Sequence, residues 1–268
     1  MAPIGRPRSY HTNADRQRAY RQRQRQRVHP QGAGTPCVQI GDHVTLYQGD
    51  ALSIAPPLQH IDAVIADPPY GTDYRFTKPR RSRTPLQPRQ PAARWTDNII
   101  GDDVPFDPTP WLGYPQVILW GADHYLDHLQ TAGKWLVWDK RDGSTSDAFS
   151  DVELAWTNLP GVNRLYRHKW RGLIREGEEN VVHGGKLHPA QKPARLMAWC
   201  VAMTTGTVLD PYMGSGTTGL ACQRLGRPFV GIEMDPHYFQ VACDRLTAAA
   251  RQGQLFPAPP EGGFCKGR

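Results

Sequence analysis

Two segments of the chain end an apolar run with residues that could carry out chemistry. The first, IDAVIADPPYGTDY at 61–74, closes a strand-like stretch with an acid, two prolines and an aromatic residue, Asp67 to Tyr70. The second, TVLDPYMGSGTTG at 207–219, closes another with Asp210 and a glycine-rich turn. Prolines cannot extend a sheet, and two in succession stiffen the turn after the strand. Both patterns therefore predict strand ends that hold polar groups in fixed positions.

The glycine-rich turn predicts a site for a nucleoside-containing cofactor. Gly214 and Gly216 allow positive φ and a close approach of the backbone to a ligand, and a helix is expected to begin near Thr217. A second strand ends at Glu233, 17 residues after Gly216, where a carboxylate can accept hydrogen bonds from both hydroxyls of a ribose. The other turn residues expected at the wall of this site are Tyr212, Met213 and Ser215.

The chemistry of this turn favours S-adenosyl-L-methionine. Its spacing lacks the third glycine of GxGxxG, which is typical of NAD sites, and the lysine of a P-loop, which is typical of ATP sites. Asp210 would repel a pyrophosphate, but it suits a ligand that has a positive amino group, a positive sulfonium and no phosphate. The alternative is an ordinary strand–turn–helix whose glycines serve packing.

Seven strand-like runs alternate with helical patterns and would position these segments. Such alternation predicts an α/β fold with a largely parallel sheet. The runs rich in β-branched and aromatic residues are 43–52, 62–67, 116–121, 134–139, 152–157, 207–210 and 228–233. The helical patterns fall at 123–131, 193–204, 216–225 and 236–250.

Positive charge gathers in two parts of the chain. The net charge is +7, yet residues 1–30 hold eight Arg and one Asp, and residues 71–100 hold seven Lys or Arg and two Asp, which leaves the remainder at −5. Such patches suit a polyanion such as nucleic acid, with a solvated tail and a solvated loop as the alternative. We expect three parts: a basic, disordered tail (1–36), a single domain (37–254) and an irregular C-terminal tail (255–268).

Several classes of protein are disfavoured by composition. The five cysteines are scattered and form no CxxC pair, which predicts reduced thiols and no metal site. No run approaches the ~18 consecutive apolar residues that span a bilayer, and the N-terminus lacks the apolar region of a secretory signal. We therefore expect a cytoplasmic protein with no membrane partner.

Together, the two segments resemble the beta group of amino-methylating (DPPY) DNA methyltransferases. ADPPYGTDY precedes LDPYMGSGTTGLA, the circularly permuted order of that group, and GDAL (49–52), ILWGADHY (118–125) and HPAQKPARLMAWCV (188–201) agree with it. The resemblance covers residues 38–250. It implies a Rossmann-like, S-adenosylmethionine-dependent methyltransferase fold with six parallel strands and one reversed strand, 152–157, and places the DPPY strand beside 207–210.

The resemblance gives the DPPY residues catalytic roles. An exocyclic amine is a poor nucleophile because its lone pair is delocalised into the ring, and an acceptor for each N–H, placed off the ring plane, would make the nitrogen more tetrahedral. Asp67 can supply a carboxylate oxygen and Pro68 its carbonyl, while Pro69 stiffens the turn. Tyr70 can stack on a base flipped out of the duplex. An aspartate at the first position favours adenine in this family.

Further cofactor contacts are implied by the same resemblance. Asp50 and Ala51 are expected near the cofactor adenine, Lys192 in the segment that closes over its methionine part, and Asp67 beside its sulfonium. The alternatives are a surface-turn aspartate and a lysine at a helix start. Residues expected to be structural are His188, Trp120, Trp135 and Trp138.

We therefore predict a site-specific, adenine-specific DNA methyltransferase of the restriction-modification type. Double-stranded DNA is the expected partner, with phosphate contacts from the tail 6–27 and the loop 75–94, and target recognition from 163–186 or the basic loop 75–100. A homodimer is compatible with the sequence, and no restriction partner is identified. The alternatives are a cytosine amino methyltransferase of the same fold, an inactive DNA-binding accessory protein, and a nicotinamide oxidoreductase, which the missing GxGxxG disfavours.

Overall fold

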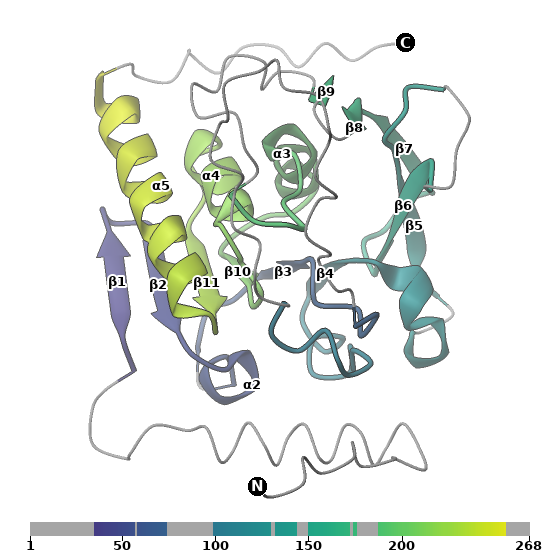
Figure 1. Cartoon of the computed structure of the whole chain (residues 1–268), viewed down its shortest axis with the longest axis horizontal. Helices are drawn as coiled ribbons and strands as arrows, with labels where there is room; N and C mark the ends of the chain where they lie inside the picture. The colour runs from purple at the N-terminus through teal and green to yellow at the C-terminus, as the bar shows by residue number, and fades with distance from the viewer. Residues whose placement is uncertain are drawn as a thin grey trace, which may run out of the picture.

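A twisted sheet runs through the computed structural model from edge to edge (Figure 1). The structure describes residues 35–56, 58–73, 99–129, 132–143, 150–171, 174–175 and 187–255. Within these ranges the sheet has nine strands in the order β1-β2-β11-β10-β3-β4-β6-β5-β7, and β8 and β9 form a separate pair. The expected phosphate contacts at 6–27 and 75–94 lie outside the described residues.

The bounds of the elements are as follows. The strands are β1 Cys37–Ile40, β2 Val44–Gln48, β3 Ala63–Ala66, β4 Gln116–Trp120, β5 Lys134–Asp139, β6 Val152–Thr157, β7 Arg164–Arg167, β8 Trp170–Arg171, β9 Ile174–Arg175, β10 Val208–Asp210 and β11 Phe229–Glu233. The helices are α2 Ala51–Ile54, α3 Ala194–Ala202, α4 Thr217–Arg224 and α5 Pro236–Leu255, with two 3₁₀ helices, η1 Ala122–His124 and η2 Leu126–His128.

The sheet confirms the Rossmann-like topology implied by the resemblance. Strands β2, β11, β10, β3, β4 and β5 run parallel, and β6 is antiparallel to both of its neighbours, β4 and β5. The DPPY strand β3 pairs with β10, as expected, and precedes it in the chain. Two edge strands were missed: β1, antiparallel to β2, and β7, parallel to β5. Both are short and largely exposed, so they carry little apolar signal.

The central strands read as continuous apolar runs because both of their faces are buried. In β3, Ala63 and Ile65 pack in a core with residues of α3, α4 and α5, while Val64 and Ala66 pack in a second core with Trp111. Figure 1 shows α3, α4 and α5 side by side on one face of the sheet. This packing holds the carboxyl ends of β3, β10 and β11 rigidly next to one another.

The α-helix expected at 123–131 is not present in the structure. The structure has two 3₁₀ helices there, η1 and η2, which begin after Gly121 in the left-handed region (φ 72°). Ala122 and Tyr125 are buried, but Leu126, which an α-helix would place on the same face as Ala122, is 51% exposed, so that face is not continuously buried. The Tyr125 hydroxyl instead donates to the carbonyl of Trp120 at 2.6 Å and ties this turn to the end of β4.

Three further features concern membrane-spanning helices, metal ligands and cysteines. In the part of the chain that the structure describes, no helix combines the length and the apolar character required to cross a bilayer. No group of His, Cys, Asp and Glu in those same ranges could hold a metal ion. The described cysteines are free thiols, buried at Cys200, Cys222 and Cys243 and exposed at Cys37.

Candidate active site

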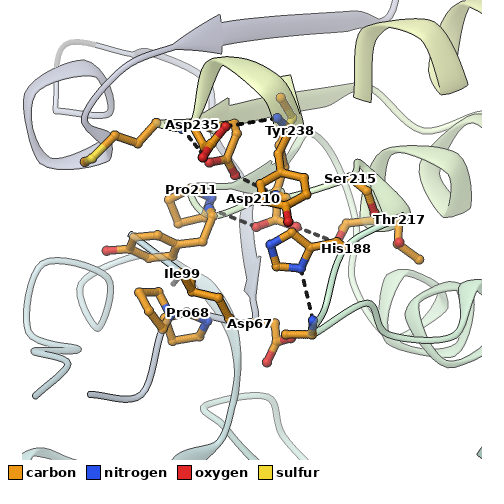
Figure 2. Close-up of a pocket in the computed structure, with 18 of the residues that line it drawn as sticks. Asp67, Pro68, Ile99, His188, Asp210, Pro211, Ser215, Thr217, Asp235 and Tyr238 are labelled. Atoms are coloured by element: carbon orange, nitrogen blue, oxygen red, sulfur yellow. Dashed lines mark hydrogen bonds between the residues drawn. The ribbon is translucent and has the colours of Figure 1, made fainter. Parts of the chain in front are cut away.

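A cavity opens where three neighbouring parallel strands end. Asp67 follows β3, Asp210 ends β10 and Glu233 ends β11, so the parallel register brings the three carboxyl groups to one edge of the sheet. Figure 2 shows Asp67 and Pro68 at one side of this cavity and Asp235 at the opposite side, with Asp210 between them. The two segments singled out from the sequence therefore share one cavity.

Most of the residues proposed from the sequence line this cavity. Those in the lining are Ala51, Asp67, Pro68, Pro69, Lys192, Asp210, Tyr212, Met213, Gly214, Ser215, Thr217 and Glu233. Asp50, Tyr70 and Gly216 are not in it. Residues that the sequence did not single out as ligand contacts, but that also line it, include Ile99, Ile100, His188, Asp235 and Tyr238.

The glycine-rich turn is held to the end of β11 by Glu233. The backbone N–H of Gly214 donates to Oε2 of Glu233 at 2.9 Å, and that of Asp235 donates to Oε1 at 2.8 Å. Gly214 (φ 51°) and Gly216 (φ 78°) both adopt the left-handed region, as the pattern predicts, and Gly216 is the N-cap of α4. Burial raises the pKa of Glu233 to about 7, although these N–H groups oppose the rise.

Asp210 is a buried carboxyl group in the cavity wall. Its Oδ1 accepts from the backbone N–H of Tyr212 at 3.1 Å, and its Oδ2 accepts from the Thr218 hydroxyl at 2.5 Å. Burial raises its pKa to about 7, against the effect of both hydrogen bonds. A carboxyl group with this pKa gains most from a positively charged ligand, because the ligand would return it to the ionised state.

Asp67 ends a chain of charged groups that are buried or partly buried. The Tyr70 hydroxyl donates to its Oδ1, and Lys192 Nζ donates to its Oδ2 at 2.7 Å. The same Nζ lies 3.0 Å from Oε2 of Glu153 on β6, whose Oε1 accepts from Lys140 Nζ at 3.0 Å. Four charged side chains thus form one connected network behind the cavity.

Opposed effects set the ionisation of this network. Burial raises the pKa of Asp67, and Lys192 counteracts that rise. Burial would also raise the pKa of Glu153, but Lys192 and Lys140 together lower it to about 2. Burial would lower the pKa of Lys192, yet Asp67 and Glu153 raise it above its usual value. Glu153 and Lys192 therefore stay charged at neutral pH.

Sequence reasoning missed Glu153 and Lys140 in this network. The signal was present: Glu153 is an acid inside the apolar strand VELAWT, and Lys140 directly follows KWLVWD. Lys192 was expected over the cofactor, and it does line the cavity, but its amino group points to Asp67 and Glu153. The partners come from segments far apart in the chain, so only the folded structure identifies them.

Tyr70 lies beside the cavity, and its ring packs against His124. The ring stacks on that of His124, with centroids 4.8 Å apart and planes 13° apart, and it also lies against Gly121. Asp102 fixes the backbone after it by accepting from the N–H of Gly71 at 3.0 Å and from the hydroxyl of Thr72 at 3.0 Å. Neither His124 nor Asp102 was singled out from the sequence.

The remaining expected contacts have structural surroundings. Asp50 caps α2 by accepting from the N–H of Leu52 at 3.3 Å and the hydroxyl of Ser53 at 2.8 Å, so its contacts are those of the surface-turn alternative. His188, expected to be structural, lines the cavity and packs edge-on against Tyr238, 4.3 Å between ring centroids. Of the three tryptophans expected to be structural, Trp120 and Trp138 are fully buried and Trp135 is half-buried.

The strand order and the cavity at the strand ends define the class of Rossmann-like α/β proteins. Residues 124–244 match the family model described as DNA methylase. The Type II methyltransferase M2.LlaDCHI of Lactococcus lactis subsp. cremoris is 31% identical over 121 residues, 44% of this chain and 43% of that protein. M2.DpnII of Streptococcus pneumoniae is 40% identical over 82 residues, 30% of each protein. These matches confirm the resemblance to amino-methylating DNA methyltransferases.

The matched regions are partial. The chain spans less than half the length of these curated relatives. Among solved structures, PvuII DNA methyltransferase (cytosine-N4-specific) is 15% identical, with a TM-score of 0.49 over 82% of this chain and 96% of that one. The M1.HpyAVI–SAM complex is 22% identical, with a TM-score of 0.44 over 76% and 98%. The fold assignment therefore rests on the strand order described above.

Proposed function

We propose that this protein is a site-specific DNA methyltransferase that transfers a methyl group from S-adenosyl-L-methionine to the exocyclic amino group of adenine. The observation that carries the proposal is the shared cavity of Asp67–Pro68 and the glycine-rich turn at 214–217. It brings an acceptor pair for an amino group next to a site suited to a nucleoside with a positive charge. The family match at 124–244 supports the same reaction class.

The cavity residues fit the proposed cofactor in their chemistry. Asp210, buried, and Glu233, half-buried, are acceptors on adjacent strands, able to face a cation and ribose hydroxyls, and Ile99, Ile100 and Met213 offer apolar contacts for a base. No lysine or arginine other than Lys192 is among the residues of the cavity lining, and Lys192 is neutralised by Asp67 and Glu153. This donor set disfavours a phosphorylated cofactor. When bound, S-adenosyl-L-methionine supplies an electrophilic methyl group.

The residues of the DPPY segment would prepare the amino group. Asp67 and the carbonyl of Pro68 would each accept one N–H, which draws the nitrogen toward a tetrahedral shape and exposes its lone pair. Positioning and electrostatic preorganisation would lower most of the barrier. Tyr70 holds Asp67 through its hydroxyl. A base stacking on the ring face that His124 covers would require His124 to move aside.

DNA is the proposed substrate, and its base would have to leave the duplex to reach the cavity. Within the proposed recognition region 163–186, the described part is strand-rich and basic: Arg164, Arg167 and Lys169 are exposed. Tyr166, between them, stacks on Trp199 of α3, which anchors β7 to the domain. We propose that this surface contacts DNA, together with the segments 6–27 and 75–94.

Expression in a host that lacks DNA methylation tests the reaction directly. Host DNA is digested to nucleosides and examined by mass spectrometry, and N6-methyladenine is the expected product because the first motif residue is Asp67. N4-methylcytosine would assign the cytosine alternative. No modified base at any expression level would favour an inactive accessory protein. The Asp67→Ala variant, expressed in parallel, controls for modification by the host.

Binding of the cofactor should tighten as the pH rises through 7. Asp210 and Glu233 have pKa values raised to about 7, so the free protein binds protons there that a cationic ligand would displace. Between pH 6 and pH 8 the dissociation constant should fall by about 10-fold, with protons released on binding. Calorimetry in buffers of different ionisation enthalpy measures both quantities.

The ligand's own amino group also titrates near this range, so a matched variant is needed. Asp210→Asn removes one titrating group while keeping the shape of the site. It should bind more weakly, with a flatter pH dependence than the wild type. An unchanged pH dependence in this variant would show that Asp210 does not face the positive ligand.

A further inference from the structure

We propose that Glu153 is a positioning residue for methyl transfer, which holds Lys192 against Asp67 and so fixes the orientation of the carboxylate that accepts the target amino group. The inference deepens the proposed function and rests on it. It assigns a role to a residue of the reversed strand β6, which lies outside the cavity lining.

The geometry restrains both oxygens of Asp67. Tyr70 donates to Oδ1 from the same loop, and Lys192 donates to Oδ2 at 2.7 Å from the segment before α3. The carboxylate cannot rotate without losing one of these contacts, and each oxygen keeps a second lone pair for an incoming N–H. Lys192 has four rotatable bonds, so its own position needs a second anchor, which Glu153 provides at 3.0 Å.

Glu153 is itself held from the far side. Its Oε1 accepts from Lys140 at 3.0 Å, just after β5, while its Oε2 faces Lys192. Lys192 is 9% exposed and Glu153 29%, so this network is shielded from solvent more than a surface pair. The order Lys140, Glu153, Lys192, Asp67 alternates in charge from the sheet to the cavity.

Charge balance explains why an acid is needed behind Lys192. An amino nitrogen that attacks a sulfonium methyl acquires positive charge, which an uncompensated buried lysine beside it would oppose. Glu153 offsets the charge of Lys192, so the negative charge of Asp67 still acts on the amino group. Lys192 in turn opposes the rise in the pKa of Asp67 that burial causes, and a protonated Asp67 would be a poorer acceptor.

Other titratable groups also interact with Asp67, and their effects can be distinguished from those of Lys192 and Glu153. Tyr70 and Tyr125 interact with it electrostatically, but burial raises the pKa of each well above 10, so both remain neutral at the working pH. Asp210 on β10 also interacts with Asp67, and its pKa is raised to about 7. Since Asp210 is unchanged in variants of Lys192 and Glu153, differences among those variants report the network.

The test compares Lys192→Met, Glu153→Gln and the double variant. Removing Lys192 leaves two carboxylates near each other, so the pKa of Asp67 should rise and the acid limb of kcat should move to higher pH. Glu153 raises the pKa of Asp67, so in Glu153→Gln the acid limb of the kcat–pH profile should not move to higher pH. The value of kcat at pH 8 should nevertheless fall about 10-fold, because Lys192 loses its second anchor. In the double variant the acid limb should lie below that of Lys192→Met.

A second readout needs neither cofactor nor DNA. The protein is labelled with ¹³C at aspartate carboxyl groups, and the resonance of Asp67 is assigned by its loss in Asp67→Asn. Its titration should shift upward in Lys192→Met and not upward in Glu153→Gln. The matched control is Asp151→Asn, which breaks a different ion pair beside β6, with Arg141 at 2.7 Å. It should lower stability without shifting the acid limb of kcat or the titration of the Asp67 resonance.

Wild-type kcat in Glu153→Gln, or loss of stability in all variants with no shift in the Asp67 titration, would overturn the proposal. If the wild type transfers no methyl group while the Asp67 resonance responds as expected, the ion-pair assignment is supported and the proposed function is not. If the wild type methylates DNA and Glu153→Gln behaves like Asp151→Asn, the function stands and the role of Glu153 does not.

Discussion

Replacing Asp67 by alanine is expected to lower the rate of methyl transfer by about 10³-fold or more while S-adenosyl-L-methionine still binds. The change removes one of the two proposed acceptors for the amino group and leaves the carbonyl of Pro68 without its counterpart. Asp210, Glu233 and the glycine-rich turn keep their contacts with one another, so the affinity for cofactor should change much less than kcat. Single-turnover methylation and calorimetric cofactor binding measure the two effects separately.

The result needs a control for the buried charges that Asp67 leaves behind. In the structure Lys192 also lies 3.0 Å from Glu153, so in the variant it should keep an ion-pair partner. Asp127→Asn changes an exposed aspartate in η2, outside the cavity lining, and should methylate DNA at the wild-type rate. Equal loss of kcat and of cofactor affinity in Asp67→Ala would mean that Asp67 serves binding rather than methyl transfer.

Replacing Gly121 by alanine should displace the ring of Tyr70 and lower kcat by about 10²-fold. A Cβ at Gly121 would overlap ring atoms Cε1 and Cζ of Tyr70, so the ring would have to leave its position. Its hydroxyl would then lose Asp67, and its stacking on His124 would be broken. Cofactor affinity should fall less, because neither Gly121 nor Tyr70 lines the cavity. Kinetics at saturating cofactor with thermal unfolding of each variant measure the effect.

Two further variants separate the causes. Gly226→Ala places alanine at a similar positive φ, 61° against 72°, where a Cβ meets no atom within 4 Å, so it carries the backbone strain of about 1–2 kcal/mol without the collision. It should lose stability and retain kcat. Tyr70→Phe keeps the ring and removes the hydroxyl bond to Asp67. If Gly121→Ala and Gly226→Ala have the same kcat, contact with Tyr70 is not what Gly121 contributes.

The sequence alone predicted the two motifs, their order along the chain and the strand ends that carry them. Apolar runs that finish in Asp67 and Asp210 predict strand ends, since parallel strands buried on both faces need continuous apolar sequence. The left-handed conformations of Gly214 and Gly216 follow from residue type. The α-helix expected at 123–131 was wrong: Leu126, whose apolar side chain fits the helical pattern, is exposed in the structure.

Edge strands and helix caps were harder to predict because both depend on contacts rather than on a local apolar pattern. Strands β1 and β7 are stabilised by pairing with β2 and β5 rather than by apolar residues of their own. Asp50 shows the converse case: it is an acid that follows a strand close to the cavity, yet its oxygens cap α2 locally. Residue type and position leave both uses possible, and the capping contacts became visible only in the folded structure.

By itself, the sequence determined the sheet class, the order of the two motifs and the site at the strand ends, because local residue patterns dictate strands, turns and the residues that terminate them. Only the tertiary structure decided that Lys192 faces Asp67 and that Glu153 of β6 lies behind it. A buried charge is paired through space by whichever element packs next to it. Lys192 and Asp67 are 125 residues apart, and no local pattern records that distance.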